Sequence, residues 1–267
     1  NSILSLYLSA FHFFVVTLRP DITNKAMMIL YRIYQFLIMI PILLVATIIA
    51  ALVTIIGCMI GPGAFWGYYP ARLWARLFCL LTFVKVTVKG RENINKGTSY
   101  VFVANHQGAY DIFAIYGYLN HNFRWMMKKS LEKIPLVGYS CRKAGHIYVD
   151  NRTPSGIRQT MDDAERQLSR GMSVVVFPEG SRTLDGRVHA FKRGAYTLAV
   201  EFGLPVVPVT IDGAYKVMPR RAKLPRPGHI ILTIHKPITA PASGHDLSQL
   251  MTESRNAILS SLPAQED

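Results

Sequence analysis

The sequence predicts an α/β fold: a mixed, largely parallel sheet flanked by helices and preceded by an apolar N-terminal membrane helix or helix pair. Three observations lead to this prediction. Residues 33–60 contain no Asp, Glu, Lys or Arg. Beyond Val84, short β-prone runs alternate with helical patterns, as in α/β domains. Two polar motifs follow two of those runs directly. The 267 residues accordingly divide into an uncertain apolar leader, membrane-anchoring helices, an α/β domain and a polar C-terminal tail, at 1–26, 27–83, 84–240 and 241–267.

The composition is apolar and basic, which narrows the class of partner. Hydrophobic residues make up 50% of the chain and the net charge is +14. A strongly basic balance implies an anionic partner, such as nucleic acid, anionic lipid or a phosphorylated substrate. The apolar segment favours lipid, and the chain has no zinc-finger spacing and no G-x-G-x-x-G. We therefore expect a bilayer partner, no nucleic-acid partner and no metal site. Cys58, Cys79 and Cys141 are too few and too far apart to indicate a disulfide framework.

The uncharged stretch 33–60 predicts a membrane anchor. As a helix it would be about 42 Å long, against a bilayer core of ~30 Å. A secretory h-region is only ~7–15 residues, and no small-residue cleavage site follows. Residues 1–18 are also uncharged and could form another short apolar helix, while Met27 or Met28 would make a plausible native start.

A helix pair dipping into one leaflet fits the sequence as well as a single span does. Pro41 would kink the first helix, and the Gly-Pro-Gly at 61–63 would end it. Aromatic residues typical of a membrane interface then lead into a second apolar helix at 71–83. Lys and Arg lie on both sides of the anchor, which is compatible with both flanks being cytoplasmic and slightly favours the helix pair.

Five β-prone runs predict the strands of the sheet. The run 84–89 alternates apolar and polar side chains, as a half-buried strand does. The other four are continuous apolar runs, which suit strands covered on both faces. They are residues 100–104, 174–177, 206–211 and 230–234.

Two helices are predicted between these strands. Thr153 can cap a helix that has Pro154 at its first position, and Gly171 can end it. Apolar residues recur inside this segment at helical spacings. A second helix is expected over about 192–202. Strands alternating with helices indicate an α/β domain, in which ligands bind outside the carboxyl ends of the strands.

The first polar motif, Asn105-His106-x4-Asp111, follows the run 100–104. A neutral imidazole can take a proton from a hydroxyl, while a carboxylate on the other ring nitrogen fixes the tautomer. No Ser or Cys lies within the motif, so the hydroxyl would belong to a substrate. Taken alone, a His-x4-Asp is more often a structural histidine at a strand end.

The second motif, Phe-Pro-Glu-Gly-Ser-Arg at 177–182, follows the run 174–177. Arg182 can bind a phosphate bidentately, and Gly180 permits a tight turn or a close approach to a ligand. Taken alone, this motif could equally be a surface turn with an ion pair. Both motifs are expected at the same edge of the sheet, which favours one shared site.

Together the motifs resemble the glycerolipid acyltransferase family, most of all its 1-acyl-sn-glycerol-3-phosphate acyltransferases. The Asn-His-x4-Asp motif is that family's first block, and 177–182 is its third, usually with Thr where this chain has Ser181. The stretch 203–209, which contains Pro205, resembles the fourth block. Residues 128–138 resemble the family's Lys-x-x-Leu…Ile-Pro-x-x-Gly stretch. The resemblance covers most of residues 84–215, in order.

One block departs from the family pattern. The second block is commonly Gly-x-Ile-Phe-Ile-Asp-Arg. Here Gly145 to Asp150 match, but Asn151 takes the arginine position and Arg152 follows. Either Arg152 serves from a shifted loop or the role is not needed.

The resemblance implies roles for particular residues. His106 would be the general base and Asp111 its orienter, in a motif that includes Asn105. Glu179 and Arg182, beside Gly180 and Ser181, would bind a phosphate-bearing acceptor. Lys128, Lys192 and Arg152 would add charge there, although the lysines could equally form a solvated basic face.

The implied reaction is acyl transfer from a thioester to the free hydroxyl of lysophosphatidate, giving phosphatidate. Acyl-CoA or acyl carrier protein would be the donor, and no cofactor is expected. Acylation of glycerol 3-phosphate or another lysolipid would show the same blocks. Outside the acyltransferases, a membrane-bound lipid hydrolase and a non-catalytic lipid-binding protein would also fit an apolar, basic chain. The expected location is a bacterial inner membrane, with the active site facing the cytoplasm.

A last feature is a basic segment with five cations and no acid at 216–226. It could rest on anionic lipid headgroups, at ~1 kcal/mol per residue near the surface, or be a mobile basic loop.

Overall fold

In the computed structural model, residues 20–240 and 247–263 are described, and the chain divides into two units, 1–45 and 46–267. The apolar helix expected at 1–18 lies outside the described residues, as do both ends of the C-terminal tail, 241–246 and 264–267.

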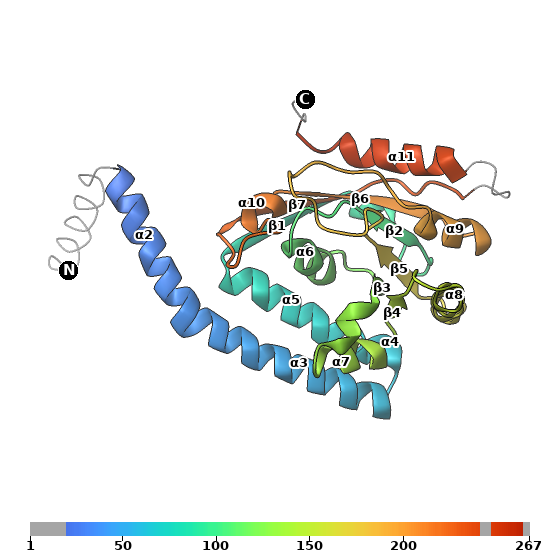
Figure 1. The fold of residues 1–267 in the computed structure, drawn as a ribbon, viewed down its shortest axis with the longest axis horizontal. Helices are drawn as coiled ribbons and strands as arrows, with labels where there is room; N and C mark the ends of the chain where they lie inside the picture. The colour runs from blue at the N-terminus through green and yellow to red at the C-terminus, as the bar shows by residue number, and fades with distance from the viewer. Residues whose placement is uncertain (1–19, 241–246, 264–267) are drawn as a thin grey trace. The chain divides into compact units, whose positions relative to one another are not determined.

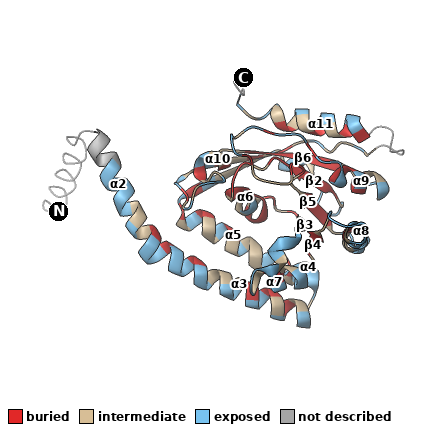
Figure 2. Ribbon diagram, in the orientation of Figure 1, coloured by how far each residue is buried: buried red, intermediate tan, exposed pale blue. Residues whose placement is uncertain are grey.

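The uncharged N-terminal segment is helical throughout. Helix α2 (Pro20–Tyr34), a π-helical turn η1 (Gln35–Met39) and helix α3 (Ile40–Ile60) follow one another without a break. The disturbance expected at Pro41 takes the form of this wider turn, in which the N–H of Ile40 donates to the carbonyl of Gln35. The wider turn suits a proline, whose ring would otherwise meet a carbonyl of the preceding turn. The helix Lys25–Ile60 is long and apolar enough to cross a membrane, and most of its surface is exposed (Figure 2).

The part of α3 from Ala46 onward packs against two further helices, α4 (Gly63–Trp66) and α5 (Tyr69–Leu81). The indole Nε1 of Trp74 donates to Thr47 Oγ1 at 2.9 Å. Gly57 leaves room for the ring of Trp66, since a Cβ at Gly57 would overlap that ring. The structure therefore contains an apolar helix pair, in which α5 is the second apolar helix that the sequence predicts.

Helix α5 also belongs to the α/β domain, which corrects the boundary predicted at residue 84. Ala75 and Cys79 are fully buried in the domain core, whereas Leu73 and Leu80 on the other side of the helix are exposed. Helix α5 therefore covers the sheet with one face and leaves Leu73 and Leu80 exposed on the other, together with Arg76.

The seven-stranded sheet has the order β1-β7-β6-β2-β5-β3-β4. Strands β6, β2, β5, β3 and β4 run parallel, β7 is antiparallel to β6, and β1 is parallel to β7. The predicted mixed, largely parallel sheet is therefore confirmed. In chain order the strands are β1 (Val84–Lys89), β2 (Val101–Ala104), β3 (Phe123–Lys128), β4 (Ile147–Val149), β5 (Ser173–Val176), β6 (Val206–Asp212) and β7 (Gly228–Ile234).

Helices cover both faces of the sheet (Figure 1). Along β2, Phe102 and Ala104 point into the core shared with α5 and α6, whereas Val101 and Val103 point into the core shared with α8, α9 and α11. This alternation is the period of two expected of a strand buried on both faces. The remaining helices are α6 (Tyr110–Tyr118), α7 (Val137–Lys143), α8 (Pro154–Leu168), α9 (Gly194–Glu201), α10 (Ala214–Val217) and α11 (Leu247–Leu259), with short 3-10 turns η2 (Arg91–Asn93) and η3 (Lys129–Lys133).

Helix α11 corrects the prediction of a polar tail after residue 240. Leu250 and Ile258 are buried against the sheet, and Thr210 Oγ1 on β6 donates to the carbonyl of Ile258 at 2.9 Å. The apolar residues of this helix are spaced along one face, so a segment of low average hydrophobicity still contributes to the core.

A buried histidine, His146, links helix α6 to strand β3. His146 precedes β4 and accepts a hydrogen bond from the N–H of Trp125 at Nδ1, 3.2 Å away, while its Nε2 lies 2.9 Å from Tyr116 Oη. Because Nδ1 accepts, the proton of the neutral ring is on Nε2. Burial, with a smaller effect of Arg124, lowers the pKa of His146 from 6.5 to about 3.

We expect this histidine to make the fold acid-sensitive. Below pH 6.5 the unfolded chain takes up a proton on His146 that the folded chain refuses until about pH 3. The native state therefore loses stability as the pH falls through that window, by up to about 1.4 kcal/mol per pH unit. In detergent, the Tm of His146→Gln should fall less between pH 7 and 5 than that of the unmodified protein. The exposed His229 provides the matched control, and His229→Gln should keep the original slope. Equal slopes in all three proteins would contradict the assignment.

Candidate active site

The two polar motifs emerge side by side, because β2 and β5 are parallel neighbours in the sheet. Asn105, directly after β2, is fully buried and pairs with the backbone of β6. Its Nδ2 donates to the carbonyl of Ile211 at 2.9 Å, and its Oδ1 accepts from the N–H of Ile211 at 2.8 Å. This double hydrogen bond fixes the direction in which the chain leaves the sheet toward His106.

His106 and Asp111 form the expected pair. His106 Nδ1 lies 2.7 Å from Asp111 Oδ2, which also accepts the N–H of Gly108 at 2.8 Å. Asp111 is in the first turn of α6 and is fully buried. Burial raises its pKa, while the hydrogen bonds from His106 and the backbone oppose that shift. With Nδ1–H donated to the carboxylate, Nε2 of a neutral His106 is free to accept a proton.

The imidazole of His106 is held flat against an aromatic ring. It stacks on Phe177 with 3.9 Å between ring centroids and 7° between planes, and Phe177 in turn stacks on Trp125. The His106 side chain is 14% exposed. Stacking and the Asp111 bond together leave the ring one orientation, with one edge accessible from solvent.

Glu179 has a different position from the one predicted. Its Oε1 accepts the backbone N–H of His106 at 2.8 Å, and its Oε2 accepts that of His189 at 3.0 Å. The residue is 9% exposed, and burial raises its pKa. Because both oxygens accept from the protein, and because a carboxylate repels phosphate, we reassign Glu179 from phosphate ligand to positioning residue.

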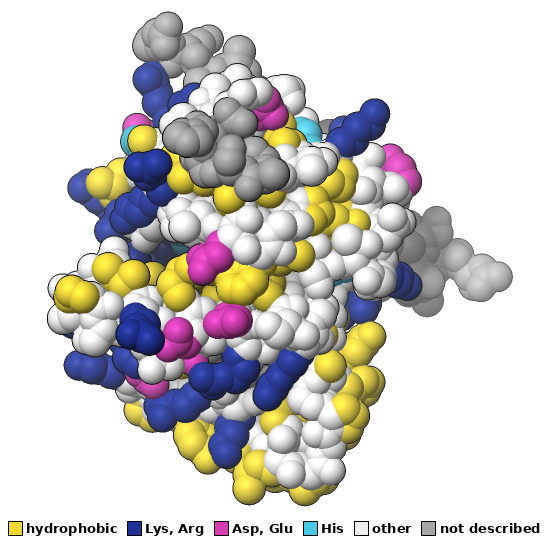
Figure 3. All heavy atoms as spheres, turned by 90° about the vertical axis from the view of Figure 1, so that its right-hand side faces the viewer, with side chains coloured by type: hydrophobic (Ala, Val, Ile, Leu, Met, Phe, Trp, Pro, Cys, Tyr) yellow, Lys and Arg dark blue, Asp and Glu magenta, His cyan; other side chains and the backbone are white. Residues whose placement is uncertain are grey.

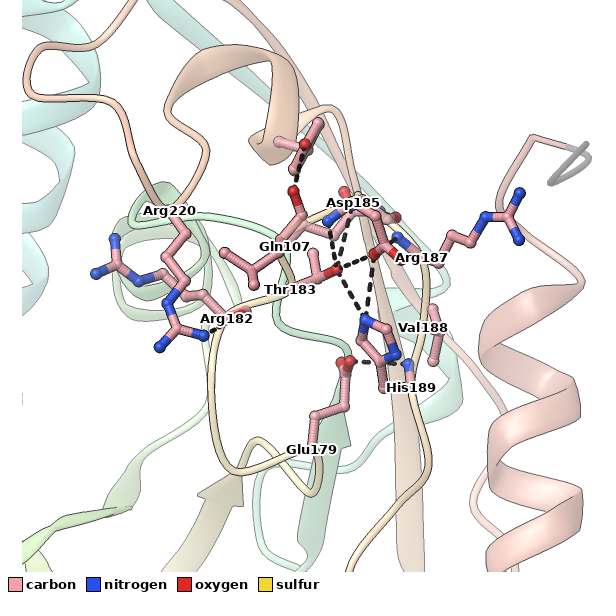
Figure 4. Close-up of polar contacts among 12 residues, drawn as sticks. Gln107, Glu179, Arg182, Thr183, Asp185, Arg187, Val188, His189 and Arg220 are labelled. Atoms are coloured by element: carbon pink, nitrogen blue, oxygen red, sulfur yellow. Dashed lines mark hydrogen bonds and ion pairs between the residues drawn. The ribbon is translucent and has the colours of Figure 1, made fainter.

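The loop after Glu179 is held by a hydrogen-bond network that the sequence did not predict (Figure 4). Thr183 is its centre, with Oγ1 2.5 Å from Asp185 Oδ1 and 3.2 Å from His189 Nε2. Gln107 Nε2 donates to the carbonyl of Gly186 at 3.2 Å, which joins the network to the His106 loop. A Thr-x-Asp-Gly turn is a recognisable signal, but nothing in its spacing indicates that it faces His106.

Arg182 and Lys192 are the predicted cations that lie on this loop. Gly180 adopts a φ of +76°, and a Cβ there would lie 2.7 Å from Lys192 Nζ, so the lysine crosses directly over the turn. The left-handed conformation favours glycine, and a side chain at this position would have to displace the end of the lysine. Ser181 lies between Gly180 and Arg182 in the same turn. Among the described residues, no carboxylate pairs with either cation.

The other predicted residues are more distant from His106 in the sheet. Lys128 is exposed at the carboxyl end of β3, the next strand after β5. Arg152 follows the edge strand β4, and its guanidinium is already paired with Asp150, at 2.9 Å on both carboxylate oxygens. Pro205 precedes β6, and its carbonyl accepts the N–H of Val101. Since Val101 begins β2, Pro205 lies at the amino end of β2, away from His106, where its carbonyl extends the pairing of the strands.

Asp150, the partner of Arg152, lines a separate hollow of about 640 Å³ with several basic side chains. This hollow is bordered by η3, α7 and α8. Figure 3 shows the surrounding face, where Lys and Arg side chains gather around a smaller group of acids. Two of its cations, Lys129 and Arg142, both pair with Glu132. This hollow does not include His106 or Asp111.

Comparison with known proteins agrees with this geometry. The model of the acyltransferase family matches residues 85–212. The chain is 34% identical over 73% of its length to a 1-acyl-sn-glycerol-3-phosphate acyltransferase of Chlamydomonas reinhardtii, and 32% identical over 73% to a chloroplastic 1-acyl-sn-glycerol-3-phosphate acyltransferase of Arabidopsis thaliana. It spans 58% and 54% of those two proteins, a little more than half their length.

A solved structure has the same fold. It is the crystal structure of the 1-acyl-sn-glycerophosphate acyltransferase PlsC from Thermotoga maritima, with a TM-score of 0.62 and 29% sequence identity. The match covers 73% of this chain and 83% of that one.

The position of Glu179 can be tested without an activity assay. In Glu179→Gln only one oxygen remains, so one backbone N–H, of His106 or of His189, would face an amide N–H instead of an acceptor. We expect a loss of about 1–3 kcal/mol in the free energy of unfolding and faster amide hydrogen exchange at one or both residues. Glu201→Gln, at an exposed carboxylate of α9, should change neither measurement. Unchanged exchange at both amides in Glu179→Gln would overturn the positioning role.

Proposed function

We propose that this chain transfers a fatty acyl group from a thioester to the free hydroxyl of lysophosphatidate, giving phosphatidate in phospholipid synthesis. The match of residues 85–212 to the model of the acyltransferase family supports the proposal. The 2.7 Å contact between His106 Nδ1 and Asp111 Oδ2 carries the chemistry of the proposal. The acceptor is proposed because both the curated relatives and the Thermotoga maritima protein are named for acylating a glycerophosphate of this kind.

In the proposed reaction His106 is the general base. Its Nε2 takes the proton of the acceptor hydroxyl as the hydroxyl oxygen attacks the thioester carbonyl. The Asp111 carboxylate stabilises the imidazolium that forms, without taking the proton itself. The tetrahedral intermediate collapses with cleavage of the C–S bond, and the imidazolium returns the proton to the departing thiolate. The nucleophile is the substrate's own hydroxyl, so the transfer is direct and has no acyl-enzyme intermediate.

The acceptor phosphate is proposed to bind to the loop that follows β5. Arg182 offers a guanidinium fork suited to a phosphate, and Lys192 holds an ammonium over the same turn. Lys128 at the end of β3 would extend the positive edge. Glu179 supports this arrangement indirectly, because it fixes the backbone of His106 and of the loop relative to each other.

The lipid acceptor also requires a membrane. The apolar helix Lys25–Ile60 is long enough to cross one, and α5 exposes large apolar side chains, Tyr69, Leu73 and Leu80. We therefore propose that the enzyme works at a bilayer surface. A bacterial inner membrane with the active site on the cytoplasmic side remains our prediction for the location; the Arabidopsis relative is named as chloroplastic.

One assay separates the candidate reactions. Purified protein is offered lysophosphatidate or glycerol 3-phosphate as acceptor, each with matched acyl-CoA and acyl carrier protein donors. Phosphatidate formation with either donor supports the proposal and identifies the donor. Acylation of glycerol 3-phosphate alone would make that molecule the acceptor, and release of free fatty acid without an acylated product would indicate a hydrolase.

We expect His106→Ala to lower kcat for phosphatidate formation by at least about 100-fold, because the substitution removes the proposed general base. The variant should remain folded, since among the described residues the His106 side chain contacts Asp111 through a hydrogen bond and Phe177 through a ring stack. Circular dichroism and flotation with vesicles check folding and membrane binding. Retained turnover in a folded, membrane-bound His106→Ala would exclude the base assignment.

We expect Arg182→Ala to raise the KM for lysophosphatidate more than the KM for the acyl donor, because the guanidinium is proposed to bind the acceptor phosphate. Initial-rate kinetics with each substrate varied in turn measure both constants. A rise confined to the donor KM would move Arg182 to the donor site.

A further inference from the structure

The connection between α10 and β7, residues 218–227, contacts both loops that carry the polar motifs. The N–H of Ala109 donates to the carbonyl of Met218 at 3.2 Å. Gly108 lies equally close to this segment, since a Cβ there would lie 2.6 Å from the carbonyl oxygen of Ala214 and 2.7 Å from that of Met218. The start of the connection is thereby fixed to the loop that carries His106.

The same connection is joined to the loop that carries Arg182. Tyr215 Oη in α10 donates to the carbonyl of Leu184 at 2.8 Å. Further along, Arg220 Nη1 donates to the carbonyl of Arg182 itself at 3.1 Å. The N–H of Arg226 donates to the carbonyl of Val217 at 2.9 Å, which ties the base of the connection together. The basic segment at 216–226 is therefore attached to both motifs.

This attachment places two like charges together. Arg220 Nη1 reaches the backbone of Arg182, and Figure 4 shows both arginine side chains on the same side of the loop, away from the Thr183 network. Within the described ranges, no Asp or Glu oxygen lies within 4.0 Å of either guanidinium. Two adjacent guanidinium groups without a counter-charge repel each other, and an anion between them relieves that repulsion. A phosphate monoester carries up to two charges near neutral pH and accepts hydrogen bonds from both forks.

We propose that Arg220 is a second ligand of the acceptor phosphate, which it binds together with Arg182. This inference rests on the proposed function and extends it to a residue outside the family blocks. Arg221 and Lys223 belong to the same segment, but only Arg220 is hydrogen-bonded to the Arg182 turn among the contacts of the described residues. Arg221 is exposed, as Arg220 is, so it provides a control that removes the same charge from the neighbouring position.

The test uses the full chain in vesicles of neutral phosphatidylcholine, with lysophosphatidate and acyl-CoA varied in turn. Arg220→Ala should raise the KM for lysophosphatidate about 10- to 100-fold, the loss expected for one charge-assisted hydrogen bond. The kcat and the donor KM should change little, and Arg221→Ala should behave like the unmodified protein. Arg220→Gln, which keeps a donor for the Arg182 carbonyl but not the charge, should resemble Arg220→Ala. A Gln variant with unmodified kinetics would show a structural role and overturn the proposal.

Two further arms distinguish the sources of phosphate. If Arg220 bound bilayer headgroups, both alanine variants would be impaired alike and the defect would grow with the content of anionic lipid. If it bound phosphates of the donor, the donor KM would rise with acyl-CoA but not with an acyl-pantetheine lacking the nucleotide. Either result overturns the proposal. In the Arg182→Ala/Arg220→Ala double variant, the rise in acceptor KM should be smaller than the product of the two single effects, because both residues are proposed to bind one phosphate.

A binding measurement separates this inference from the proposed function. Glycerol 3-phosphate is titrated into the purified protein by calorimetry, with no donor present. Binding that weakens in Arg220→Ala but not in Arg221→Ala supports the phosphate site even if the unmodified protein forms no phosphatidate. Formation of phosphatidate with unchanged acceptor KM in Arg220→Ala would leave the proposed function intact and overturn the second ligand.

Discussion

The active-site edge depends on the two hydrogen bonds that the buried carboxylate of Glu179 accepts from the backbone of His106 and of His189. The parallel pairing of β2 and β5 brings two loops to one edge, but it does not determine how the loops lie. The Glu179 carboxylate fixes their relative position by accepting from both loops. Moving either loop would leave a buried charge without a donor, at a cost of several kcal/mol. The same His106 whose backbone this carboxylate holds makes the Phe177 stack and the Asp111 pairing with its side chain.

Much of the fold could be predicted from the sequence, because five of the strands are apolar or alternating runs. Strands β3 and β4 are absent from that prediction for physical reasons. The first contains Arg124 and Lys128, and the second has three residues between a buried histidine and a charged turn. Arg124 is buried by donating to the carbonyls of Phe123 and Gly63 and to the side chain of Asn122, which no periodicity reveals.

For the site, residue type and position after a strand were enough to predict that His106 and Asp111 meet and that Arg182 lies in the turn after the neighbouring strand. Neither could give the direction of a side chain, and so Glu179 was predicted to face a phosphate, although it faces the protein. Arg152 follows a strand just as Arg182 does, but its neighbour Asp150 satisfies it. Arg220 was recognised only as one cation among five, because its contact with Arg182 spans 38 positions in the chain and has no local signature.

Helix α5 connects the apolar helices to the His106–Asp111 pair. One of its faces lies in the core, its Trp74 is bonded to α3, and Arg76 Nε donates to the carbonyl of Gly117 in α6 at 2.9 Å. Since α6 begins at Tyr110 and carries Asp111 in its first turn, the orienting carboxylate and the second half of α3 belong to one continuous body. For a chain held on a bilayer by these helices, this continuity would carry the membrane attachment directly to the His106–Asp111 pair. Under the proposed function the acceptor is a lipid that reaches the enzyme by lateral diffusion, so the rate is expected to follow the surface density of that lipid rather than its bulk concentration.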